Sequence, residues 1–98
     1  MPKLNFSRTH DFSSDKINAR ADVLVKKLKE KMASLGMDYT WRQDKSGIDF
    51  TGNGFKGTFD IKPTEVNMLI DLSLMLAPFK GMVEGQIEKA LDKLVKKD

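Results

Sequence analysis

Residues 55–72 read FKGTFDIKPTEVNMLIDL, and this stretch decides the fold. Apolar residues, with Gly57 among them, occupy every second position on both sides of the Lys62-Pro63-Thr64 turn. Successive side chains of a strand point to opposite faces of a sheet, so this period of two predicts two strands with one apolar face each. The short turn makes the pair antiparallel, with the apolar face covered and the other face in water.

The same alternation continues toward the N-terminus. Segments 37–42 and 48–51 alternate in the same way, and residues 44–47 (DKSG) read as the turn between them. Asn53-Gly54 favours a type I′ hairpin turn, in which both central residues have positive φ. Four consecutive strands in an antiparallel meander are therefore expected between residues 37 and 72.

Two helices are predicted by apolar residues that recur every three or four positions. They are Ile17, Ala21, Leu24, Leu28 and Met32 in the first helix, and Val83, Ile87, Ala90, Leu91 and Leu94 in the second. The Ser13-Ser14 pair offers a hydroxyl cap to the first helix, and Gly36 is placed to end it in a left-handed conformation. Pro78 suits the first turn of the second helix, where its missing N–H is not needed.

The short alternation around Leu4 and Phe6 adds a strand before the first helix. The order β-α-β-β-β-β-α then predicts an α+β fold, an antiparallel sheet of about five strands with two helices packed on one face. If the first helix runs back along the first strand, the first and last strands run in opposite directions and can pair. Residues 1–98 are expected to form a single domain, since one domain typically takes about 100–150 residues.

The composition excludes several kinds of chemistry. The chain has no cysteine, which rules out disulfides, thiolate zinc sites and cysteine nucleophiles. The glycines of residues 52–57 lie between two strands and lack the helix and Lys-Ser/Thr ending of a phosphate loop. No nucleophile elbow is present. We therefore expect no catalytic, cofactor-binding or metal-binding residues, no cofactor and no enzymatic activity. His10 is the only histidine, and a lone imidazole between a strand and a helix cap is most often a surface or hydrogen-bonded structural residue. It is nevertheless the residue to mutate if an activity appears.

The N-terminal residues MPKLNF begin no apolar stretch of the kind that a signal peptide needs. The longest apolar run, residues 72–79, is far shorter than the roughly 20 residues that span a bilayer. A cytoplasmic location without a transmembrane segment is expected.

The first candidate surface is apolar. Residues 69–79 (LIDLSLMLAPF) are more apolar than a half-exposed strand requires. Core packing at the junction of strand and helix is one explanation. The other is a contact surface for a second copy of the chain, a lipid-like ligand or a hydrophobic particle. Its candidate contacts are Leu69, Leu74, Met75 and Phe79.

The second candidate surface is basic. The formal net charge is +3, and most of the excess lies in the first third of the chain. Lys16, Arg20, Lys27 and Lys31 fall within one arc of the first helix, beside its apolar face. This basic stripe would suit phosphates, an anionic surface or an acidic partner. Alternatively, the aliphatic stems cover the edge of the core while the charges reach water.

Nucleic-acid recognition by the sheet itself is disfavoured. Sheets that bind single strands place aromatic rings on the exposed face, where bases stack on them. Here Phe6, Tyr39, Trp41, Phe50, Phe55 and Phe59 all fall on the apolar side. Acids such as Asp49 and Asp60 on the polar face are expected to meet lysines such as Lys56 in cross-strand pairs.

In their order along the chain, these elements resemble the polyhydroxyalkanoic acid system family of small bacterial proteins. The resemblance rests on a short strand leading to His10, a long helix, the strands around Tyr39-Thr40-Trp41, Ile48-Asp49-Phe50 and Gly57, and the run from Leu72 to Phe79. It covers residues 4–94 and implies a link to the storage of bacterial polyester, without an activity, cofactor or catalytic residue. The expected function is that of a non-enzymatic accessory protein. Its partner would be the polyester granule surface or a granule protein, and the alternative is nucleic-acid or anionic-surface binding through the basic stripe.

Overall fold

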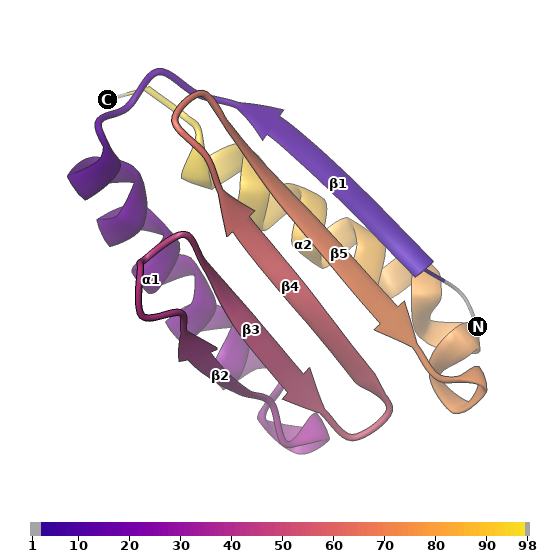
Figure 1. Cartoon of the computed structure of the whole chain (residues 1–98). Helices are drawn as coiled ribbons and strands as arrows, with labels where there is room; N and C mark the ends of the chain where they lie inside the picture. Colours follow the sequence, from indigo (N-terminus) through magenta and orange to yellow (C-terminus); the bar gives the residue numbers. More distant parts are fainter. Residues whose placement is uncertain (1–2, 98) are drawn as a thin grey trace.

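The computed structural model describes residues 3–97. Within them, five strands form one antiparallel sheet in the order β1-β5-β4-β3-β2 (Figure 1). The strands are β1 (Lys3–Thr9), β2 (Asp38–Trp41), β3 (Gly47–Gly52), β4 (Phe55–Ile61) and β5 (Glu65–Leu72). The helical segments are α1 (Ser14–Lys31), the 3-10 turn η1 (Ala33–Leu35), the 3-10 segment η2 (Leu74–Phe79) and α2 (Lys80–Leu94).

The first and last strands pair, as the path of the first helix predicts. β1 lies antiparallel beside β5, from Lys3 opposite Asp71 to Thr9 opposite Glu65. β2 to β5 follow one another as the expected meander. The sheet therefore ends in β1 on one edge and β2 on the other (Figure 1).

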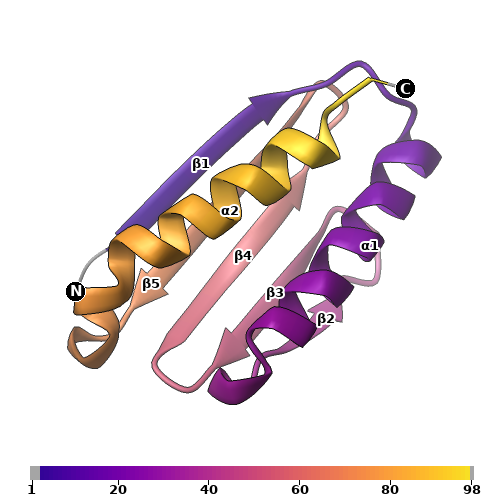
Figure 2. The same ribbon diagram turned by 180° about the vertical axis from the view of Figure 1, so that it is seen from behind.

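Both helices cover the same face of the sheet (Figure 2). α1 contacts β2, and α2 contacts β1 at the other side. The hydroxyl of Ser13 caps α1 by accepting a hydrogen bond from the backbone N–H of Lys16 at 3.2 Å. Gly36, with a φ of 64°, ends the 3-10 turn that follows α1. The predicted α+β architecture is confirmed, with the other face of the sheet left open.

The core lies between this sheet and the two helices. Its aromatic members Phe6, Phe50, Phe55 and Phe59 are buried, and Tyr39 and Trp41 pack against them half-buried. Among the described residues no polar or charged residue is buried. The aromatic rings therefore face the helices, as the alternation predicts, and the open face offers no stacking platform.

Two local predictions are wrong. In the β3–β4 hairpin only Gly54 has a positive φ, 91°, whereas Asn53 does not, so the turn is not type I′. The N–H of Asn53 donates to the carbonyl oxygen of Leu35 at 2.7 Å, and this hydrogen bond to η1 holds the backbone of Asn53.

Pro78 lies within η2 rather than in the first turn of α2, which begins at Lys80. Because proline has no backbone N–H, Pro78 cannot donate a hydrogen bond within a regular α-helix, and α2 begins only after it.

Candidate functional site

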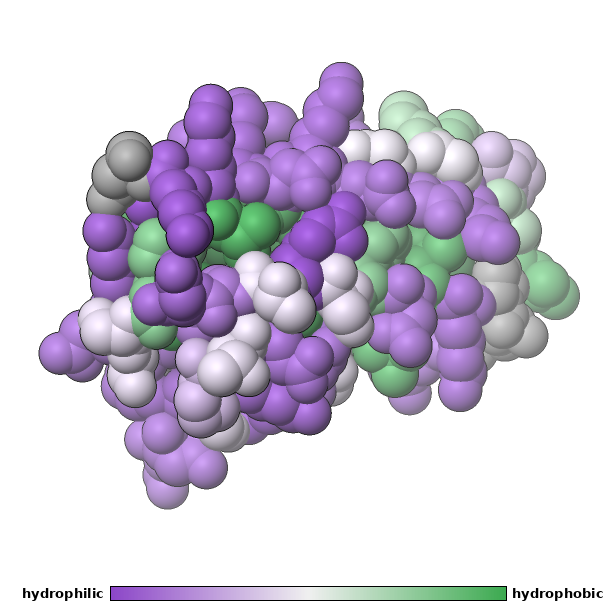
Figure 3. Space-filling model, turned by 90° about the horizontal axis from the view of Figure 1, so that it is seen from above, coloured by the Kyte–Doolittle hydropathy of each residue, from purple (hydrophilic) through white to green (hydrophobic). Residues whose placement is uncertain are grey.

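Three large apolar side chains are exposed at the end of the molecule where β5 leads into α2. Leu74, Met75 and Phe79 of η2 are 75%, 80% and 51% exposed, and we call them the apolar tip. Figure 3 shows hydrophobic side chains at this end of the molecule and also between the hydrophilic side chains in the middle of the view. Met82, three residues beyond Phe79 in α2, is also exposed and extends the apolar surface along the helix.

A hydrogen bond and one buried leucine fix the position of the apolar tip. The N–H of Ser73 donates to the carbonyl oxygen of Gly54 at 2.8 Å, which ties the start of η2 to the β3–β4 hairpin. Leu76 is the buried member of η2 and packs into the core. With Leu76 turned inward, Leu74 and Met75 face solvent on a backbone that is held in place.

Leu69, the fourth predicted apolar contact, lies elsewhere. It is 40% exposed on the open face of β5, in the same row as Asn5 of β1 and Thr58 of β4. The run of residues 69–79 thus places its exposed apolar side chains on two separate surfaces.

Two members of the predicted basic stripe, Lys16 and Arg20, make contacts within the fold. Arg20 places its guanidinium 4.2 Å from the ring centroid of Phe12 and donates to the carbonyl oxygens of Leu94 and Lys96 at 3.0 and 2.7 Å. Lys16 lies over the same ring at 5.3 Å. Arg20 thereby holds the end of α2 against α1.

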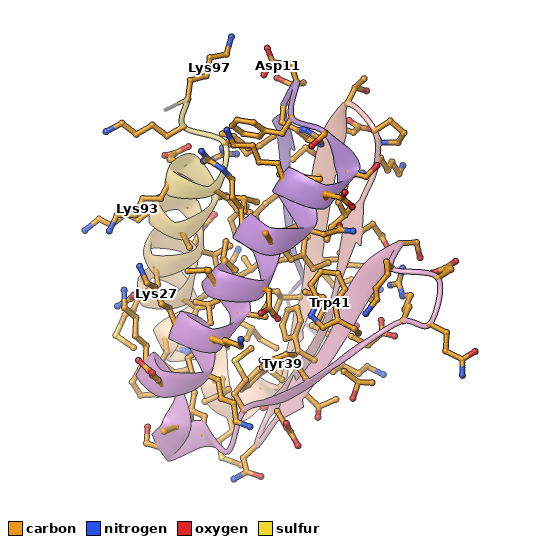
Figure 4. All side chains as sticks on the ribbon, turned by 90° about the vertical axis from the view of Figure 1, so that its left-hand side faces the viewer. Asp11, Lys27, Tyr39, Trp41, Lys93 and Lys97 are labelled. Atoms are coloured by element: carbon orange, nitrogen blue, oxygen red, sulfur yellow. The ribbon has the colours of Figure 1, made fainter. Side chains whose placement is uncertain are left out.

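Lys27 and Lys31, the other two members of the stripe, line a groove between α1 and α2 of about 400 Å³, and Arg20 lines the same groove. Lys89 and Lys93 of α2 lie along the same groove. In Figure 4, Lys27 and Lys93 come from the two helices and lie on the side of the helix layer away from the sheet. Sequence patterns place lysines on each helix separately, but they do not show that these two sets share one groove.

The acids of the open face are held by an arginine. Arg42, just after β2, donates to Oδ1 of Asp49 at 3.0 Å and to Oδ1 of Asp60 at 2.6 Å. Both contacts raise the pKa of Arg42 above its ordinary value, Asp49 more strongly. The prediction that lysines such as Lys56 pair with these acids is therefore wrong. From the β2–β3 turn Arg42 reaches acids on both β3 and β4, which period-two alternation does not reveal.

His10 has a structural role, through partners that the sequence does not reveal. The N–H of Phe12 donates to its Nδ1 at 3.2 Å, so the proton lies on Nε2, which donates to the carbonyl oxygen of Lys62 at 2.9 Å. The imidazole thereby links the start of α1 to the β4–β5 turn.

Trp41 attaches the short edge strand β2 to α1. Its indole Nε1 donates to Oδ1 of Asp22 at 3.0 Å, and Figure 4 shows the ring between α1 and the sheet. The hydrogen bond from Lys26 and then that from Trp41 lower the pKa of Asp22.

Within residues 3–97, no group of three or more His, Asp or Glu side chains is arranged to hold a metal ion. Over the same range no helix is long and apolar enough to cross a membrane.

Comparisons with known proteins place the chain in a family. Residues 4–95 match the model of a family described as "Putative polyhydroxyalkanoic acid system protein". No curated protein matches the chain. The crystal structure of TTHA0849 from Thermus thermophilus is similar, with a TM-score of 0.54 over 96% of this chain and 89% of that one. At 13% identity this similarity shows a shared fold alone. With nearly its whole length matched by the family model, the chain belongs to the polyhydroxyalkanoic acid system protein family.

Proposed function

We propose that this protein is a non-enzymatic accessory protein that binds the hydrophobic surface of polyester storage granules in the bacterial cytoplasm. The apolar tip is the contact. Membership of a family named for the polyhydroxyalkanoic acid system supports this choice of partner. The observation that carries the proposal is the exposure of Leu74, Met75 and Phe79 on one fixed segment.

The exposed fractions set the strength of this contact. Fully burying a side chain of this size contributes about 2.5 kcal/mol. Scaled by exposed fractions of 75% and 51%, Leu74 and Phe79 together contribute about 3 kcal/mol when a granule covers them. Removing both therefore weakens binding by a factor of roughly 150, and a charge in their place weakens it further.

Co-sedimentation with purified granules tests the proposal. The Leu74→Asp/Phe79→Asp variant should remain folded and move from the pellet to the supernatant. Val23→Asp is the matched control, because Val23 is a 52% exposed apolar residue on α1, away from η2. Retention of the double variant on granules would rule out the apolar tip as the contact.

Leu69→Asp separates the two apolar surfaces. Because Leu69 lies on the open face of the sheet, we expect this variant to pellet with granules as the wild type does. Its release would place the open face in the contact.

The alternative is binding of nucleic acid or an anionic surface through the basic stripe. Since Lys16 and Arg20 contact Phe12, the lysines along the helix groove would carry this function. Phosphate binding weakens steeply with salt, whereas apolar adsorption does not. The Lys27→Glu/Lys31→Glu variant should still bind granules. If this variant no longer binds them, the result would favour the alternative.

A further inference from the structure

The groove between α1 and α2 has an apolar floor. Val23, Leu24 and Leu28 line it from α1, and Ala90 and Leu94 line it from α2. Its volume of about 400 Å³ lies within the range of sites that hold small molecules. Val23 is 52% exposed here, so apolar surface remains open to solvent between the two helices.

The rim of this groove carries one sign of charge. Lys27, Lys31, Lys89 and Lys93 line it, and among the described lining residues there is no aspartate or glutamate. Within residues 3–97, the structure pairs none of these four lysines with a carboxylate. Neighbouring Lys26 and Lys29, in contrast, lie 2.8 and 3.4 Å from Asp22 and Asp38. Four cations around an apolar floor create a positive potential that is complementary to an anion with an apolar tail.

We propose that this helix groove binds a single-chain amphiphile with a carboxylate headgroup. The acyl chain lies on the floor formed by Val23, Leu24 and Ala90, and the carboxylate lies among the rim lysines. This ligand uses both features of the groove, since a purely apolar molecule leaves the lysines unpaired and a bare anion leaves the floor in water. The inference goes beyond granule binding and does not depend on it, because the apolar tip shares no residue with the groove.

Amide NMR spectra of the full chain, titrated with decanoate, test the assignment. Shifts are expected at Val23, Lys27 and Ala90. Octanoate should bind about 15-fold more weakly, because each methylene contributes about a factor of four. Decyltrimethylammonium, which has the same tail and the opposite charge, should bind at least tenfold more weakly than decanoate. Equal binding of the two ten-carbon probes would overturn the role of the lysines.

Charge-reversal variants provide a second test of the groove. Lys27→Glu/Lys93→Glu replaces one lysine on each side of the groove and should weaken decanoate binding at least tenfold. Lys56→Glu/Lys80→Glu changes the net charge equally at exposed positions outside the groove and should leave binding unchanged. Equal affinity of both variants for decanoate would contradict the proposal.

The site of the shifts separates this inference from the proposed function. In the Leu74→Asp/Phe79→Asp variant, decanoate should still shift Val23 and Ala90. Shifts confined to residues 74–79 of the wild type would overturn the groove assignment and leave granule binding through the apolar tip in place. An acidic partner protein that binds the groove while decanoate does not would overturn it as well.

Discussion

Two leucines in one six-residue segment, Leu74 and Leu76 of η2, should respond very differently to the same substitution. Leu76 is 7% exposed and packs in the core, whereas Leu74 is 75% exposed. Replacing either one with alanine removes the same atoms from the same kind of backbone. The comparison decides whether residues 74–79 serve as core or as contact surface, which the sequence leaves open.

The magnitudes follow from burial. Leu76→Ala removes three buried carbon groups, worth about 0.8 kcal/mol each, and leaves a cavity, so it should cost about 3 kcal/mol of unfolding free energy. For a domain of this size the melting temperature falls by roughly 12–24 °C. Leu74→Ala should change the unfolding free energy by less than about 0.5 kcal/mol, because its side chain is already in water.

Urea unfolding followed by circular dichroism measures both variants, at low and at high protein concentration. We expect that only Leu76→Ala lowers the free energy of unfolding, and that it does so by the same amount at both protein concentrations. An equal loss for Leu74→Ala would show that Leu74 is buried in solution and would refute the apolar tip. A loss for Leu74→Ala that grows with protein concentration would identify a second copy of the chain as the cover.

Three further predictions concern residues that the fold depends on. The lowered pKa of Asp22, due to Lys26 and then Trp41, stabilises the native state above the usual aspartate pKa, and this stabilisation is lost as the pH falls below about 4. The cost of Asp22→Asn in urea unfolding should therefore be present at pH 7 and diminish as the pH is lowered from about 4. Gly57→Ala should cost about 1–3 kcal/mol in the same assay, because an aromatic ring of β3 and a carbonyl oxygen of β5 already occupy the place of the new methyl group. His10→Ala removes the hydrogen bonds of both ring nitrogens and should cost about 1–2 kcal/mol, and an unchanged stability would return His10 to the functional candidates.

The sheet was predictable because the residue patterns that specify it lie within short stretches of sequence. Period-two alternation in residues 55–72 identifies the covered face of β4 and β5, and the short turn between them leaves only antiparallel pairing. The pairing of β1 with β5 is not local, but it follows from the order of the elements, since a helix that returns along β1 sets the direction of the next strand.

The candidate site was only partly predictable, because its parts come from distant segments. Lys27 and Lys93 meet along one groove only because α1 and α2 pack side by side on the sheet. Arg20 binds the carbonyl oxygen of Leu94, 74 residues away, a partner that the pattern of its own helix does not reveal. His10 likewise finds its partner, Lys62, across the fold. Helix periodicity gives the direction of a side chain but not its neighbour.

Co-sedimentation of the purified protein with native polyester granules, at low salt and in about 1 M NaCl, tests the central claim most directly. At the higher concentration, exposed charges are screened beyond roughly 3 Å, whereas apolar contacts persist. The apolar tip predicts that the protein pellets with the granules under both conditions. A protein that stays in the supernatant, or that leaves the granules when salt is added, would contradict binding through Leu74, Met75 and Phe79.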